Sequence, residues 1–252
     1  MKSAVMAPRT RSHERIASTA DPPRPTVDIY NTRPPEAQRS SGVDAPCTRW
    51  TYVILKRVID VPAAFVLLLV LAPVLVLLAA AIRLTSRGPV VFGHRRVGRH
   101  GCSFTCYKFR TMFADAERKL LADPKLRRRY VANDYKLPDG CDPRITGLGA
   151  FLRRTSLDEL PQLFNVLRGD MSLVGPRPVV ADELQWYGDR GDELLTAFPG
   201  LTGRWQVRGR STVGYPERVG VELAYVREWS FWRDAAYLLR TVPAVLSRHG
   251  AH

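Results

Sequence analysis

Two adjacent carboxylates, Asp158 and Glu159, occupy a stretch of sequence that suits phosphate chemistry. Arg153 and Arg154 precede them and Pro161 follows, so we expect a helix to begin within a few residues before that proline. The first turn of a helix offers free N–H groups and the positive end of the dipole, which favour a phosphate and, with the arginines, would keep Asp158 ionised. An ionised Asp158 could attack phosphorus to form an acyl phosphate, and Glu159 could hold Mg²⁺ against the same phosphates.

The same residues also admit a purely structural interpretation. Ser156 and Glu159 have the spacing of a capping box, in which both side chains bond only backbone N–H groups at the start of a helix. Spacing alone favours this cap over catalysis.

Two further basic motifs could contact phosphates. Lys108 and Arg110 alternate within an extended stretch, so they would point to one face of a strand and could both meet a diphosphate. Arg177 lies between two prolines that stiffen its loop and fix its direction. A solvated strand face and a plain turn are the alternatives for these motifs.

The charge of the chain is concentrated in one segment. Residues 83–180 hold 19 basic and 9 acidic groups, a net +10 of the total +14. This excess indicates a localised anionic partner, which could be phosphates, nucleic acid or a lipid surface. The composition, 45% hydrophobic and 25% charged, excludes a wholly disordered or collagen-like chain, and four cysteines are too few for a disulfide scaffold.

A long apolar run dominates the sequence. Residues 61–82 carry no charge, and about 20 apolar residues span a bilayer as a helix. Pro73 lies in the middle of the run, where a proline kinks or breaks a helix. Both flanks are basic, so neither end prefers the outside. A kinked spanning helix and a re-entrant helix–break–helix in one leaflet therefore both stay open.

The remaining patterns predict a mainly α-helical fold with a short β-hairpin. The hairpin falls within residues 88–107, and helical patterns cover residues 112–131, 144–169 (broken near residues 154–156 and followed by a C-cap at Gly169) and 217–245. Within the first of these, residues 127–129 are three arginines that could touch anionic headgroups or form a solvated helix end. Seven of the 19 prolines fall in residues 1–50, which we expect to be disordered. The predicted domains are residues 1–50, the membrane helix 51–84 and a catalytic domain 85–252.

Ordered motifs along residues 56–252 resemble one known family. They include Lys56-Arg57-x-x-Asp60, Tyr107 to Met112, Phe151 to Asn165 and Gly175-Pro176-Arg177-Pro178. Together they resemble the bacterial sugar transferase family, the monotopic phosphoglycosyl transferases that start exopolysaccharide and O-antigen assembly. The resemblance implies transfer of a sugar-1-phosphate from a UDP-sugar to a polyprenyl (undecaprenyl) phosphate, with release of UMP.

The resemblance also implies roles for individual residues. Asp158 stands where the family has its nucleophile, and Glu159 stands where it has a glutamate associated with Mg²⁺. The motifs place Lys108 and Arg153 at phosphate-contacting positions, and Arg110 and Arg177 in motifs whose roles are less defined. Pro73 matches the proline that breaks the family's re-entrant helix, which favours insertion into one leaflet with both ends cytoplasmic.

The expected protein is therefore a monotopic enzyme on the cytoplasmic face of a bacterial inner membrane. Its catalytic domain would consist of interfacial helices, its partners would be the two substrates and membrane lipid, and a homodimer is compatible with the resemblance. The alternative is a non-enzymatic basic membrane protein that binds nucleic acid or anionic lipid. That alternative leaves Asp158 and Glu159 unexplained, and the aromatic residues lack an RNA-binding signature. The patterns do not identify the sugar.

Overall fold

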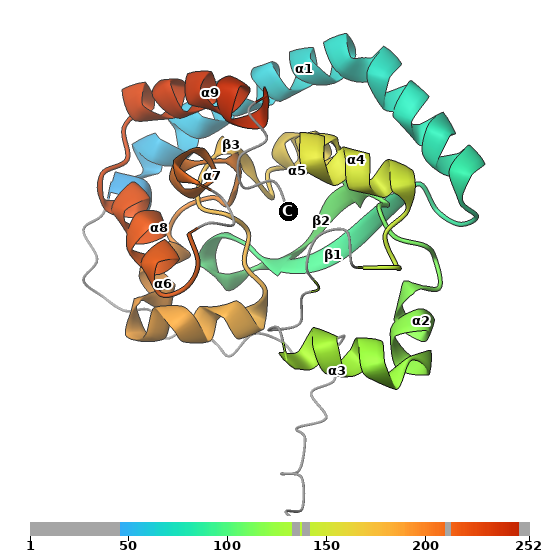
Figure 1. Cartoon of the computed structure of the whole chain (residues 1–252). Helices are drawn as coiled ribbons and strands as arrows, with labels where there is room; N and C mark the ends of the chain where they lie inside the picture. The colour runs from blue at the N-terminus through green and yellow to red at the C-terminus, as the bar shows by residue number, and fades with distance from the viewer. Residues whose placement is uncertain (1–45, 133–136, 138–141, 210–212, 247–252) are drawn as a thin grey trace, which may run out of the picture. The chain divides into compact units, whose positions relative to one another are not determined.

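A computed structural model describes residues 46–132, 137, 142–209 and 213–246 (Figure 1). Helices dominate this part of the chain, and its strands form two small two-stranded sheets, as expected for a mainly α-helical fold with a hairpin. The predicted disordered extension lies outside the described residues, apart from residues 46–50. These form the 3₁₀ turn Pro46–Thr48 and the beginning of the first helix.

The apolar run forms α1 (Trp50–Thr85), the one helix of the described chain that is long and apolar enough to cross a membrane. Pro62 and Pro73 both lie inside it, and the residues on either side of them stay helical. Figure 1 shows α1 bent near its middle. The helix is therefore continuous through Pro73, where a break was predicted, because a proline removes one hydrogen bond and crowds the preceding turn without having to end the helix.

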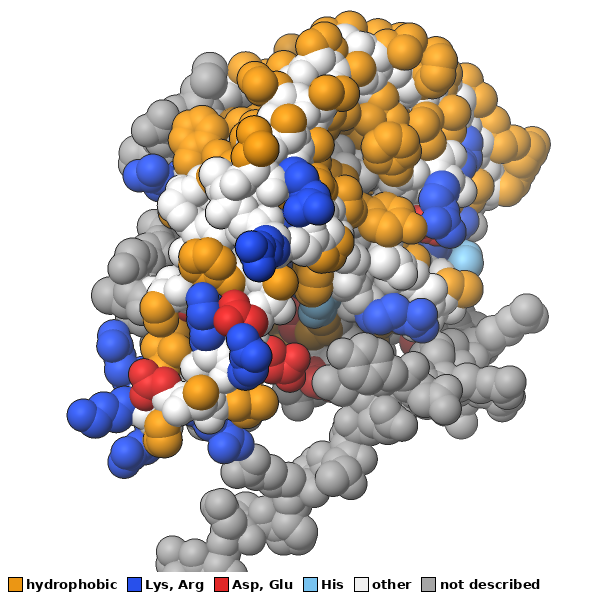
Figure 2. Space-filling view, turned by 90° about the vertical axis from the view of Figure 1, so that its right-hand side faces the viewer, with side chains coloured by type: hydrophobic (Ala, Val, Ile, Leu, Met, Phe, Trp, Pro, Cys, Tyr) orange, Lys and Arg blue, Asp and Glu red, His pale blue; other side chains and the backbone are white. Residues whose placement is uncertain are grey.

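Both arms of α1 pack against the rest of the protein. Lys56 and Asp60 are buried in the first arm, and Leu78 and Ile82 are buried in the second. Between the arms the large apolar side chains are mostly exposed, including Leu69, which is 60% exposed. In Figure 2 these hydrophobic side chains gather at the top of the molecule, with lysine and arginine side chains below them.

The predicted hairpin is present as β1 (Val91–Val97) paired antiparallel with β2 (Ser103–Phe109). Its register sets Phe92 opposite Lys108 and His94 opposite Cys106, so these four side chains share a face. A second sheet, in which β3 (Ser172–Val174) pairs in parallel with β4 (Gly200–Thr202), was not predicted. Each of its strands has only three residues, too short for an alternating pattern to show in the sequence.

The helical pattern at residues 144–169 forms α4 (Gly147–Thr155) and α5 (Gln162–Arg168), separated at Ser156 as predicted. Gly169 ends α5 with a left-handed φ of 94°, which confirms the predicted C-cap. Asn165 fixes α5 against the hairpin, since its side chain accepts the Tyr107 N–H at 3.0 Å and donates to the Thr105 carbonyl at 2.7 Å.

The pattern at residues 112–131 forms two helices, α2 (Ala116–Ala122) and α3 (Pro124–Ala132), because Pro124 can begin a helix but cannot continue one. Figure 1 places α3 at the opposite end of the molecule from α1. The three arginines at residues 127–129 are all exposed, and on α3 they lie away from the apolar surface of α1. This position favours their solvated alternative over contact with headgroups.

The C-terminal helical prediction is confirmed. After the short helices α6 (Gly191–Leu194) and α7 (Arg204–Arg208), the chain forms α8 (Glu217–Arg227) and α9 (Phe231–Leu246). The last helix has exposed apolar side chains, among them Trp232 at 78% and Leu239 at 76%. Figure 1 shows α9 on the same side of the molecule as α1.

Candidate active site

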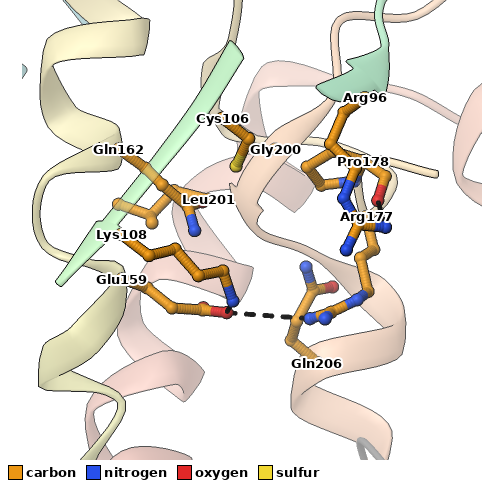
Figure 3. Close-up of a pocket in the computed structure, with 10 residues that line it drawn as sticks. All are labelled: Arg96, Cys106, Lys108, Glu159, Gln162, Arg177, Pro178, Gly200, Leu201 and Gln206. Atoms are coloured by element: carbon orange, nitrogen blue, oxygen red, sulfur yellow. Dashed lines mark hydrogen bonds and ion pairs between the residues drawn. The ribbon is translucent and has the colours of Figure 1, made fainter. Parts of the chain in front are cut away.

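A polar pocket opens where the hairpin, α5, β4 and α7 meet (Figure 3). The residues that line it are Arg96, Cys106, Lys108, Glu159, Gln162, Arg177, Pro178, Gly200, Leu201 and Gln206. It therefore gathers Lys108, Glu159 and Arg177, three of the residues that the sequence singled out, from three segments far apart in the chain.

The turn before α5 places the adjacent carboxylates. Ser156 has a left-handed backbone (φ 56°), which reverses the chain after α4 and leads into a 3₁₀ turn, Leu157–Glu159. The Glu159 N–H donates to the backbone carbonyl of Ser156, and the Ser156 side chain does not cap this turn. The capping-box interpretation is therefore wrong, and α5 begins at Gln162, after Pro161 and not before it.

The carboxylates lie within reach of two cations. The Lys108 Nζ donates to Glu159 Oε1 at 2.6 Å and lies 3.9 Å from Asp158 Oδ2. The Arg177 guanidinium lies 3.8 Å from the same Glu159 oxygen. A phosphate entering here would meet ammonium and guanidinium groups that are already gathered on one side of the pocket.

Burial, with a smaller contribution from the neighbouring Glu159 charge, raises the pKa of Asp158 to about 6. Lys108 and Arg153 lower the pKa without outweighing burial. The neighbouring cations therefore do not bring the pKa down to its usual value, although the predicted ionised form still prevails at neutral pH. With a pKa near 6 the carboxylate is still mostly ionised at neutral pH, and it is more basic than an ordinary aspartate.

The other two predicted phosphate contacts differ from each other. Arg153, on α4, donates from Nε to Thr111 Oγ1 at 2.9 Å and is close enough to lower the pKa of Asp158. Arg110 follows the end of β2 and is buried, with its guanidinium bonded to the carbonyls of Pro89 and Ser86. It caps the end of α1, and the expectation that it shares a phosphate with Lys108 is wrong.

Four polar or thiol residues of the pocket were missed by the sequence analysis: Arg96, Cys106, Gln162 and Gln206. The hairpin register could have identified two of them, because Arg96 and Cys106 lie on the Lys108 face of the sheet. Gln162 follows Asp158 by four residues. No sequence signal identifies Gln206, which reaches the pocket from the distant α7.

A dedicated metal cage is absent from the described residues, which contain no group of three or more His, Cys, Asp or Glu side chains able to hold a metal ion. Mg²⁺ rarely needs such a cage, since it is usually bound by one or two carboxylates together with substrate phosphates and water. Asp158 and Glu159 are oxygen donors of the type that this mode of binding requires.

A second charged cluster, which we call the α1 anchor, lies outside the pocket. The Lys56 Nζ lies 2.7 Å from Asp234 Oδ2, 3.0 Å from Ser172 Oγ and 3.1 Å from the Tyr225 hydroxyl, and it also donates to the Val174 carbonyl. The Tyr225 hydroxyl in turn donates to Asp234 Oδ1 at 2.9 Å. The α1 anchor joins the first arm of α1 to β3, α8 and α9.

The comparison with protein families matches residues 51–248 to a single model, that of the bacterial sugar transferases. The chain belongs to this family. The match covers α1 and every residue that lines the pocket, so the pocket lies within the part of the chain that defines family membership.

Several curated proteins are similar to this family member. An undecaprenyl-phosphate galactose phosphotransferase of Salmonella typhimurium is 48% identical over 79% of the chain, which spans only 42% of that protein. The exopolysaccharide production protein ExoY of Rhizobium meliloti is 44% identical over 78% of the chain and 88% of its own length. A UDP-glucose:undecaprenyl-phosphate glucose-1-phosphate transferase of Caulobacter vibrioides is 40% identical over 82% of the chain and 75% of its own length.

Proposed function

We propose that this chain transfers a sugar-1-phosphate from a UDP-sugar to a polyprenyl phosphate through a covalent intermediate on Asp158. The observation that carries the proposal is the position of Asp158, a buried carboxylate with a raised pKa. It lies behind the residues that line the pocket, 3.9 Å from the ammonium of Lys108, which is one of them. The similar proteins named for undecaprenyl-phosphate transfers of galactose and glucose-1-phosphate support this reaction class.

The first step is attack by a carboxylate oxygen of Asp158 on the phosphorus attached to the sugar. The bond from that phosphorus to the bridging oxygen breaks, UMP leaves with the electron pair, and an acyl phosphate forms. Lys108 and Arg177 are placed to offset the charge that develops on the phosphate oxygens. Burial supports this step, because a poorly solvated carboxylate is a stronger nucleophile than an exposed one.

The second step reverses the chemistry with a different partner. An oxygen of the polyprenyl phosphate attacks the same phosphorus, the bond to Asp158 breaks, and the sugar becomes linked to the lipid by a diphosphate. The covalent intermediate allows a water-soluble donor and a membrane-bound acceptor to use one site in turn.

Glu159 is proposed to hold Mg²⁺ when the donor phosphates are present. The ion would neutralise charge on these phosphates when bound. The Lys108 ammonium is within 2.6 Å of Glu159 in the structure described, so binding of the ion requires that Lys108 turn toward the phosphates.

We propose that α1 inserts into one leaflet, from the cytoplasmic face of the inner membrane, and the packing of α1 supports insertion into a single leaflet. A straight helix of 36 residues would be about 54 Å long and would place its ends on opposite sides of a bilayer core of about 30 Å. Instead, Lys56 in one arm and Ile82 in the other are buried against the same domain. The exposed apolar bend and the exposed apolar face of α9 would then lie in the membrane (Figures 1 and 2).

The experiment that tests the function is UMP release by purified protein in detergent, with Mg²⁺ and polyprenyl phosphate, from a panel of UDP-sugars that includes UDP-galactose and UDP-glucose. We expect release with at least one donor and loss of release in Asp158→Asn. Full turnover by Asp158→Asn would contradict the proposed intermediate, and failure of every UDP-sugar would contradict the donor class.

A further inference from the structure

Helix α5 carries two buried amide side chains, one turn apart, in opposite situations. Asn165 is fully buried and its amide makes hydrogen bonds to Tyr107, Thr105 and Asp170. Gln162 is only 3% exposed, and within the described parts of the chain its amide makes no hydrogen bond to the protein. Its amide atoms are not among the buried atoms that lack a partner, so the amide opens to the pocket and its hydrogen-bonding groups are available to a ligand.

The free amide of Gln162 faces the pocket. Figure 3 shows its nitrogen directed into the space beside Lys108. A second amide reaches the same pocket from α7, since Gln206 lines it and its Oε1 is buried with no partner among the described residues. Helices α5 and α7, which are remote in sequence, therefore each place in the pocket an amide with no hydrogen-bond partner in the described chain.

The chemistry of an amide identifies the kind of group that would use this capacity. Each amide presents an N–H donor beside a carbonyl acceptor, which matches a hydroxyl group that accepts and donates at once. An ionised phosphate has no hydrogen to donate, so it would leave the carbonyl oxygens unpaired. Phosphate oxygens would instead bind the cationic groups of Lys108 and Arg177, which also line the pocket.

The position of Gln162 distinguishes between the two parts of a UDP-sugar that carry such groups. Gln162 follows Asp158 by four residues, and its amide lies beside Lys108, which is 3.9 Å from Asp158. In the proposed intermediate the sugar is attached directly to the phosphate on Asp158. The uracil and ribose, in contrast, are separated from that phosphorus by the second phosphate.

We propose that Gln162 and Gln206 bind hydroxyl groups of the hexosyl unit of the donor and contribute to the choice of sugar. This inference rests on the proposed function. It assigns the two amides to the sugar, and it explains why Gln162 keeps its amide open to the pocket while Asn165 on the same helix is fully bonded.

The test combines turnover with stability in four variants of the full chain, one of which is Gln206→Met. Gln162→Met keeps the size of the side chain and removes both hydrogen-bonding groups. Gln185→Met makes the same change at an exposed position outside the pocket, and Asn165→Leu removes a bonded amide. UMP release is measured with UDP-galactose and UDP-glucose, inhibition is measured with UMP, and thermal unfolding is followed without substrate.

We expect Gln162→Met to lower kcat/KM for the preferred donor about 10- to 100-fold and to reduce the discrimination between the two epimeric sugars. Inhibition by UMP should be unchanged, and the thermal midpoint should stay close to that of the unmodified protein, because the Gln162 amide makes no hydrogen bond within the described chain. Gln206→Met should reduce turnover in the same way. Gln185→Met should change neither turnover nor the thermal midpoint, and Asn165→Leu should lower the thermal midpoint.

Three results would overturn the inference. A midpoint for Gln162→Met that falls as far as that of Asn165→Leu would show that the amide is structural. Weaker inhibition by UMP, in parallel with lost turnover, would assign the amide to the nucleotide. Unchanged turnover in Gln162→Met would remove its role while leaving the proposed function intact. If the unmodified protein releases no UMP from any UDP-sugar, the proposed function itself fails and the sugar assignment falls with it.

Discussion

The α1 anchor and the pocket each combine a lysine with carboxylates, but they satisfy these charges to different degrees. In the α1 anchor the Lys56 ammonium contacts Asp234, Ser172, Tyr225 and Val174, and its side chain is almost wholly buried. In the pocket, Lys108 is shared between two carboxylates, and the pKa of Asp158 is raised to about 6. The first cluster is arranged to hold elements together, and the second is arranged to react.

The largest effect should come from the nucleophile. Asp158→Asn removes the attacking oxygen charge and should lower UMP release by about 10⁴-fold or more, as expected for loss of a covalent nucleophile. The fold should persist, because the change removes a buried charge and not a packed side chain. Initial rates and thermal unfolding of the same preparation check both expectations, and a variant that fails to fold would contradict the assignment of Asp158 to the reaction alone.

The α1 anchor should show the reverse pattern. Lys56→Met leaves Asp234 buried without its cation and should cost about 3–5 kcal/mol of stability, measured as a thermal midpoint lower by about 10 °C. Replacing both partners, as Lys56→Met with Asp234→Leu, should recover part of the loss, since a buried ion pair can often be exchanged for apolar groups. An unchanged midpoint in the single variant would mean that the α1 anchor does not hold α1.

Lys108→Met makes the matching change in the pocket. Its side chain is 25% exposed, so stability should change by about 1 kcal/mol or less. Turnover should fall by about 10²- to 10³-fold, because a preorganised cation near the developing phosphate charge is lost. If its thermal midpoint fell as far as that of Lys56→Met, the distinction between the two clusters would be wrong.

The smallest predicted effect is the pH dependence of UMP release, which reports the protonation of Asp158. Because the pKa of Asp158 is raised to about 6, the rate of UMP release should fall as pH decreases through 6, where protonation removes the nucleophile. The sign for stability is opposite. The folded protein binds this proton more tightly than the unfolded chain, so the contribution of Asp158 is favourable at low pH and is lost as pH rises through about 6.

Asp158→Asn provides the control for this prediction. An asparagine cannot ionise, so the variant should unfold at a higher temperature than the unmodified protein at neutral pH, and the difference should disappear below about pH 4. A difference that is independent of pH would show that Asp158 does not titrate as its burial indicates.

The sequence predicted individual helices and strands better than the contacts between distant segments. The apolar run, the hairpin and the separation near Ser156 were all visible, because length and periodicity determine them locally. A break was expected at Pro73, where the helix in fact continues, because a sequence does not show that both arms of α1 will be held by one domain. The parallel pairing of β3 with β4 depends on contacts between distant segments, and six residues carry no periodic signal for it.

The site was predicted where its residues lie in motifs and was missed where tertiary packing supplies them. Asp158, Glu159, Lys108 and Arg177 do meet, although the spacing of Asp158 and Glu159 alone favoured a cap. Arg110 was placed with Lys108 by strand alternation, but β2 ends at Phe109 and the next residue turns to the end of α1. The raised pKa of Asp158 depends on burial, which a count of neighbouring charges in the sequence cannot provide.

The central claim is tested most directly by intact-protein mass spectrometry after incubation with UDP-sugar and Mg²⁺ in the absence of polyprenyl phosphate. We predict that the unmodified chain gains the mass of one hexose phosphate and releases UMP in proportion. The gain should disappear when polyprenyl phosphate is added, and it should be absent in Asp158→Asn. UMP release that occurs only when both substrates are present, with no mass gain at any time, would contradict the covalent intermediate.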